Sequence, residues 1–243
     1  MTIRTKAAAL TDSGQGIRWR SHDSSRLEAF SDSVFAFAIT LVIVSTDVPK
    51  SFDQLYETMK GMLSFAICFL VLFLIWNQQN IFFRRYGLKG NYVTFLNAAL
   101  LFMVLMYAYP LRFLFFLFLS SKTYMLNGHP HPMIYSWQQP MLMMIYGAGF
   151  TVIYTLFYLM YLHVEKNADA LELTPRERFI TRTTTWSNFQ LIVIGVIAFA
   201  AAYLVPVAYA GYTGYIYLIV PVKRFLWRNY RSKKEKKLYG AGN

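Results

Sequence analysis

The chain has 243 residues, of which 56% are hydrophobic and only 15% are charged, and its net charge is +12. Such a composition leaves too little polar surface to cover a soluble core, so it excludes an ordinary soluble enzyme or binding domain. The apolar residues come in long blocks after nearly thirty mostly polar residues. The sequence therefore predicts an all-α, polytopic membrane protein.

The apolar blocks are long enough to act as transmembrane helices. A helix needs about 20 residues to cross a hydrocarbon core of roughly 30 Å, because its backbone groups must be paired within the helix. The sixth block is the shortest, since Gly211, Gly214 and Pro221 interrupt it and Lys223 and Arg224 could extend to an interface. The six predicted spans are Ala29–Val48, Met62–Phe83, Phe95–Leu119, Met141–Leu162, Phe189–Val207 and a segment from Tyr209 or Tyr212 to Leu226.

The cations are distributed asymmetrically between the loops. Of the 24 Lys and Arg residues, all but four lie before the first span, after the second, after the fourth, or from the last turns of the sixth onward. Because short loops rich in Lys and Arg stay in the cytoplasm, we expect both termini there. The predicted parts are a cytoplasmic arm (1–26), a six-helix membrane domain (27–227) and a basic tail (228–243). The same charge should attract anionic lipids, and we prefer this interpretation to nucleic-acid binding.

Sequence patterns of catalysis are lacking. The chain has no His-Glu-x-x-His pair, no Gly-x-Ser-x-Gly turn and no glycine-rich phosphate loop. Its one cysteine, Cys68, falls inside the second span and is expected to pack there. The external loop contains His129 and His131, but two histidines without a third ligand make a weak metal site. We therefore expect no enzymatic activity, no resident metal and no cofactor.

Acidic groups lie at the start of the first span. Glu28 and Asp32 are four residues apart on one helix face, where they repel each other unless donors lie between them. Arg26 and the polar residues from Trp76 to Asn80, at the end of the second span, are available partners. An ionisable group costs about 2.5–3.5 kcal/mol at mid-membrane on insertion scales. Asp32 therefore indicates either a capped helix start at the interface or a specific interhelical network.

Apolar residues also recur along the first span at alternating spacings of four and three, namely Phe30, Val34, Phe37, Leu41, Val44 and Val48. Such a stripe can face lipid, pack within the bundle, or meet copies of itself around a symmetry axis. Asp32 lies five positions before Phe37, which is about 140° around the helix. Its carboxylate should therefore point toward neighbouring helices and away from the stripe.

The first span resembles the signature of the transmembrane protein 175 potassium channels, in their short single-repeat bacterial form. The matching residues are Arg26, Phe30-Ser31-Asp32, Phe35-Ala36, Thr40-Leu41 and Pro49, followed by Trp76, Leu96-Asn97 and Pro110. The resemblance implies a homotetramer of six-helix subunits in a bacterial-type plasma membrane. It also implies a central pore that is lined by the first helices and conducts potassium as the permeant ion.

The resemblance assigns roles to individual residues. It implies a hydrophobic constriction at Phe37 and at Leu41 or Val44, with Thr40 beside them. The implied assembly and gating network comprises Arg26, Phe30, Ser31, Asp32, Trp76, Gln78 and Gln79.

Two features depart from the family pattern. Phe37 stands where Ile or Leu is usual, so four rings could seal the pore, narrow it or swing aside as a gate. Gln78 and Gln79 stand near a usual pair of histidines, and since amides do not titrate, we expect no pH response through that site.

Two other functions fit the same composition. A secondary transporter normally shows internal repeats and broken helices, whereas the Phe-Ser-Asp motif occurs only once in this chain. A family member that keeps the fold but no longer conducts is the second alternative, with Phe37 closing the axis.

Overall fold

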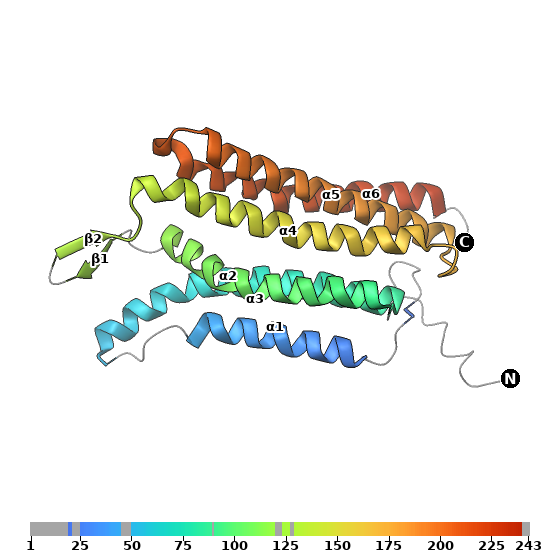
Figure 1. Ribbon diagram of the computed structural model, residues 1–243, viewed down its shortest axis with the longest axis horizontal. Coiled ribbons are helices and arrows are strands. Elements are labelled where there is room, and N and C mark those ends of the chain that lie inside the picture. Colours follow the sequence, from blue (N-terminus) through green and yellow to red (C-terminus); the bar gives the residue numbers. More distant parts are fainter. Residues whose placement is uncertain are drawn as a thin grey trace.

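The computed structural model describes residues 19–20, 25–44, 50–88, 90–119, 123–126 and 129–239. The α-helices are α1 (Arg26–Val44), α2 (Phe52–Tyr86), α3 (Asn91–Leu119), α4 (Gln139–Lys166), α5 (Pro175–Leu204) and α6 (Ile219–Tyr239). Two 3-10 helices, η3 (Ser136–Gln138) and η4 (Val207–Leu218), precede α4 and α6, and a hairpin of β1 (Thr123–Leu126) and β2 (His129–Pro132) follows α3. Figure 1 shows the helices as rods that run roughly parallel to one another.

Local sequence signals explain where several helices begin and end. Ser25 and Glu28 bond to each other's backbone N–H at the start of α1, which is a capping box. Thr174 and Glu177 repeat this arrangement at the start of α5. Helix α2 ends at Gly87, whose φ of 59° is in the left-handed region that glycine adopts at little cost.

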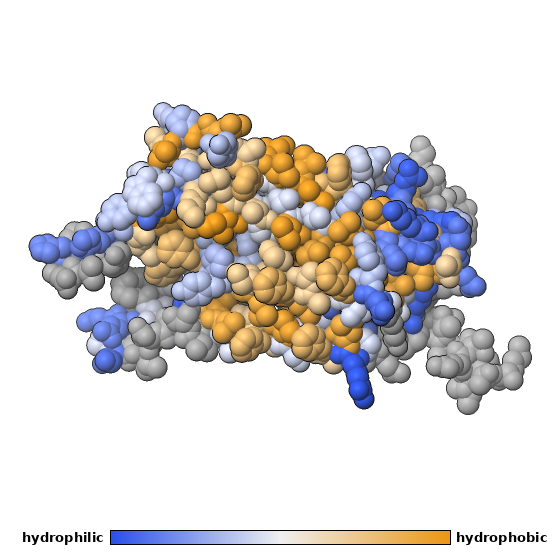
Figure 2. Space-filling view, viewed as in Figure 1, coloured by the Kyte–Doolittle hydropathy of each residue, from blue (hydrophilic) through white to orange (hydrophobic). Residues whose placement is uncertain are grey.

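Within the described residues, α2, α3, α4 and α5 are long and apolar enough to cross a membrane. Figure 2 shows apolar side chains over the middle of the molecule and hydrophilic ones toward both ends. The all-α membrane architecture is thus confirmed, whereas the count of six spans stays a prediction. The predicted first span extends beyond α1, and its residues 45–48 lie outside the described part of the chain.

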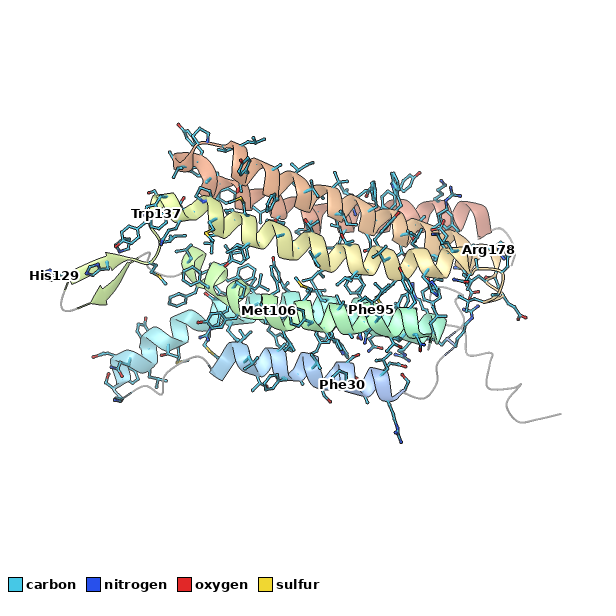
Figure 3. All side chains as sticks on the ribbon, in the orientation of Figure 1. Phe30, Phe95, Met106, His129, Trp137 and Arg178 are labelled. Atoms are coloured by element: carbon cyan, nitrogen blue, oxygen red, sulfur yellow. The ribbon has the colours of Figure 1, made fainter. Side chains whose placement is uncertain are left out.

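The helices form two groups that meet along α3 and α4. Helix α1 packs on α2 and α3, while α5 packs on α4, and η4 and α6 return along them. Figure 1 places α1 on one side of the bundle and α5 with α6 on the other, and the start of α1 and the end of α6 at the same end. Arg178 lies at that end and His129 at the opposite one (Figure 3).

The last predicted span differs in detail from the structure. Its first half is the 3-10 helix η4, which contains both Gly211 and Gly214, and its second half continues as α6 to Tyr239, well into the predicted tail. Lys223 and Arg224 are half-buried and hydrogen-bond to groups of the bundle. Lys223 Nζ donates to the Ser187 carbonyl at 2.8 Å, because this cation can offset its loss of water only through internal acceptors.

The described residues of the hairpin between α3 and α4 form no metal site, and the cysteine is packed inside the bundle. The two strands of the hairpin are antiparallel and pair His129 with Leu126 and His131 with Tyr124. No group of three or more His, Cys, Asp or Glu side chains is placed to hold a metal ion among the residues described. Cys68 is fully buried, as expected of a packing residue, with its sulfur 3.9 Å from the Ala108 carbonyl.

Glycines allow α4 and α5 to approach each other closely. A Cβ added at Gly147 would lie only 3.1 Å from the backbone N and Cα of Phe199 and 3.0 Å from its Cβ. Small residues at helix interfaces are typical of membrane bundles, where close packing replaces the hydrophobic effect as the source of association.

We expect Gly147→Ala to lower stability by about 1–3 kcal/mol, because the backbone of α5 must shift to admit a methyl group. Thermal unfolding of the purified protein in detergent measures this loss. Gly61→Ala is the matched control, since a Cβ at Gly61 would make an ordinary 3.5 Å contact with the Phe116 ring. Equal melting temperatures for the two variants would contradict the close approach.

Candidate functional site

One face of α1 is left open by the rest of the bundle. Its large side chains Phe30, Phe37 and Leu41 are 60%, 56% and 43% exposed. The small or hydroxyl residues Ala29, Ser33, Ala36 and Thr40, which lie between them, are also exposed. The spacings of three and four residues place all of these on one side of the helix.

The opposite face of α1 is packed. Phe35, Ala38 and Val42 are buried among side chains of α2 and α3, together with Ser31. Val34 is only half-buried and packs against this core, so it lies at the border between the two faces. The side chain of Val44, and Val48 altogether, lie outside the described part of the chain. The predicted stripe is thus an open face at Phe30, Phe37 and Leu41.

Asp32 points from α1 toward α2, as its 140° offset from the stripe predicts. Trp76 Nε1 donates a hydrogen bond of 2.7 Å to the Asp32 carboxylate. Glu28 does not share this donor, because its carboxylate accepts from the backbone and the hydroxyl of Ser25. The two neighbouring carboxylates therefore have separate partners. Arg26 is exposed in the first turn and, among the described residues, is not the partner of Asp32.

A buried chain of hydrogen bonds joins α1 to α3 and α2. The Ser31 hydroxyl donates to the Leu27 carbonyl of its own helix at 2.7 Å and accepts from Asn97 Nδ2 at 2.9 Å. The Asn97 carbonyl oxygen in turn accepts from Gln79 Nε2 at 2.9 Å. All three linked side chains are buried. Because lipid offers no substitute partners, such a chain favours one rotation and one depth of α1.

The adjacent residue, Gln78, points into the other half of the bundle. Its amide nitrogen donates to the Asn188 side-chain oxygen at 3.0 Å, and its oxygen accepts from Arg224 at 3.2 Å. Arg224 also donates to the Tyr154 hydroxyl at 2.7 Å. Gln78 and Gln79 together therefore connect α2 to α1 and α3 on one side and to α4, α5 and α6 on the other.

The end of the N-terminal arm is docked on the bundle. Arg20 forms a bidentate ion pair with the buried carboxylate of Glu177, with nitrogen–oxygen distances of 3.1 and 2.9 Å. Its backbone N–H donates to the Arg84 carbonyl at 3.0 Å, and the Arg84 guanidinium lies 3.7 Å from the centre of the Trp19 ring. Sequence reasoning missed this pair, because nothing in the local pattern around either residue identifies a partner 157 positions away.

The polar residues of this site serve to position helices. Amides, hydroxyls and one carboxylate orient α1, while its open face presents apolar side chains with a hydroxyl at Thr40 among them. That hydroxyl donates to the Ala36 carbonyl at 2.9 Å, so its oxygen keeps the capacity to accept from, or coordinate, a group on the open face.

Comparison with known proteins agrees with this arrangement. Residues 26–107, which contain the open face and the network around it, match the family model described as the endosomal/lysosomal potassium channel TMEM175. A protein of Marivirga tractuosa named "Potassium channel" is 33% identical over 229 residues, covering 90% of this chain and 92% of that protein. A potassium channel of Streptomyces collinus is 32% identical over 95 residues, which cover 37% of this chain and 46% of that protein.

Solved structures show the same fold. A crystal structure of a variant of the potassium channel MtTMEM175, in complex with a nanobody–MBP fusion protein, matches with a TM-score of 0.73 and 29% identity. The match covers 88% of this chain and 96% of that one. A TMEM175 homologue from Chamaesiphon minutus, at 20% identity and a TM-score of 0.52 over 86% and 96% of the two chains, shares the fold. With one third of residues identical over nearly the whole length of a relative, the chain belongs to the TMEM175 family of potassium channels.

Proposed function

We propose that the chain forms a homotetrameric channel that conducts potassium across a bacterial-type plasma membrane, with both termini in the cytoplasm. The open face of α1 carries this proposal, because four copies of that face would surround a central path. The names of the relatives support potassium as the permeant ion. The basic end of the bundle would then face anionic lipids of the cytoplasmic leaflet.

The open face of α1 is poorly suited to lipid. Asp32 is exposed beside it, and the exposed hydroxyls of Ser33 and Thr40 lie on it. A carboxylate in contact with hydrocarbon is costly, so this side of α1 should meet protein or water. The exposed small residues Ala29 and Ala36 allow helices of neighbouring copies to approach closely.

The proposed constriction lies at Phe37 and Leu41, with Val44 continuing the line. Rings of such side chains would form a narrow hydrophobic neck that dewets when tight and passes partly dehydrated ions when wider. Thr40 would offer oxygens beside the neck. Selectivity between ions would follow from the cost of dehydrating each ion and from these oxygens, without a fixed charge at the narrowest point.

The network around α1 would act in assembly and gating. Ser31 and Asp32 bond to Asn97 and Trp76, and this leaves the apolar stripe turned outward, where it would face the proposed axis. Gln79 holds Asn97, and Gln78 anchors the same turn of α2 to the other half of the bundle. Arg26 and Phe30, both exposed, would contact neighbouring copies.

Flux through liposomes tests the channel function. We expect reconstituted protein to pass potassium passively, and Phe37→Ala to raise potassium flux several-fold or to admit sodium, because it widens the neck. Tyr203→Ala, which trims a side chain that is exposed on α5, is the control and should leave flux unchanged.

Three outcomes would contradict this proposal or part of it. Strict coupling of flux to protons would favour a transporter. Flux that appears only in Phe37→Ala would identify a member sealed by that ring. An unchanged flux in Phe37→Ala would remove the residue from the pathway.

The buried chain of hydrogen bonds through Asn97 generates a second prediction. Asn97→Leu leaves the Gln79 amide without its acceptor, so we expect a loss of about 1–2 kcal/mol in stability and a lower flux per channel. Thr94→Val, one turn earlier on α3, removes an exposed hydroxyl that donates to the Gly90 carbonyl. Thermal unfolding and potassium flux of both variants measure the difference. Equal melting temperatures and equal flux for the two variants would show that these hydrogen bonds do not orient α1.

A further inference from the structure

A groove of about 680 Å³ lies where α4, α5 and α6 meet. Most of its lining comes from α5 and α6, which Figure 1 places across the bundle from α1. Each helix contributes a row of side chains at spacings of three and four residues, which puts each row on one helix face. Trp227, Tyr230 and Lys234 form the row on α6.

Polar and aromatic groups are segregated along this groove. Its charged residues lie toward the basic end of the bundle: Glu165 is next to the end of α4, Lys234 is in the last turns of α6, and Arg182 is in the second turn of α5. Trp186 and Phe189 follow Arg182 by four and seven positions, which places them about 6 and 10 Å deeper along the helix axis. The groove therefore has a charged mouth and an aromatic interior.

The two cations at the mouth are available to a ligand. The Arg182 side chain is 84% exposed, and its ion pair with Glu165 is long at 3.9 Å. Lys234 Nζ lies 5.8 Å from the centre of the Phe179 ring and 5.9 Å from that of Tyr230, so the ammonium is held over the groove wall by its aromatic neighbours. With Glu165 included, the mouth carries a net charge of +1, which suits one negative charge.

We propose that this groove binds one anionic phospholipid, with the phosphate between Arg182 and Lys234 and an acyl chain along Trp186 and Phe189. Charged residues followed by aromatic ones match the order of a lipid headgroup and its acyl chain. Trp and Tyr side chains are also enriched near the membrane–water interface. The proposal rests on the proposed orientation of the basic end toward the cytoplasmic leaflet. It requires neither the tetramer nor conduction.

Native mass spectrometry of the purified full-length protein tests the site. We expect added phosphatidylglycerol to be retained at one molecule per chain, and phosphatidylethanolamine and phosphatidylcholine to be retained at least about tenfold more weakly. The double variant Arg182→Gln/Lys234→Gln should lose this preference. Trp186→Ala should weaken retention of phosphatidylglycerol while leaving the cations in place.

A charge-matched control separates a built site from general attraction to a basic surface. Lys166→Gln/Arg178→Gln removes two exposed cations that lie outside the groove, at the end of α4 and in the first turn of α5. This control should retain phosphatidylglycerol like the wild type. Equal losses in the two double variants, full retention in the groove variant, or equal retention of the three lipids would overturn the proposal. Because the measurement counts bound lipid, its failure would leave conduction untouched.

Discussion

The attachment of α1 to the bundle by one face is the constraint on which the functional site depends. In lipid, the side chains of Ser31, Asn97 and Gln79 can pair their hydrogen-bonding groups with one another only in one register of α1. These buried hydrogen bonds therefore fix the rotation of the helix. The Trp76–Asp32 bond supports the same rotation from a second direction. With α1 held in this way, Phe30, Phe37 and Leu41 stay turned away from their own subunit.

Contacts elsewhere in the bundle support this placement of α1. Gln78 and Gln79 are consecutive on α2, yet one bonds to α3 and the other to α5 and α6. The rigid packing of α4 on α5, made possible by glycines such as Gly147, therefore provides a frame for the helix that carries the open face. The docked Arg20–Glu177 pair ties the residues just before α1 to the same frame.

The sequence alone predicted those features that depend on local period. A stripe at spacings of four and three identified the open face of α1, and the 140° offset correctly directed Asp32 toward a neighbouring helix. The partner Trp76 and the neighbouring amides came from the resemblance to a family. Contacts between distant polar residues were missed, because Arg224 and Tyr154 are 70 positions apart and neither lies in a pattern that names the other. The hydrogen bonds of Lys223 in the sixth predicted span were missed for a similar reason, since their acceptor Ser187 lies 36 positions away on α5.

Crosslinking between subunits tests the central claim most directly. In a background of Cys68→Ala, Phe37→Cys should form covalent dimers rapidly when purified protein is oxidised, because four copies of α1 would bring these positions together. Tyr203→Cys, on the exposed side of α5, should form no covalent dimers under the same conditions. Dimers formed at position 203 but not at 37, or a particle that is monomeric by mass, would contradict a pore lined by α1.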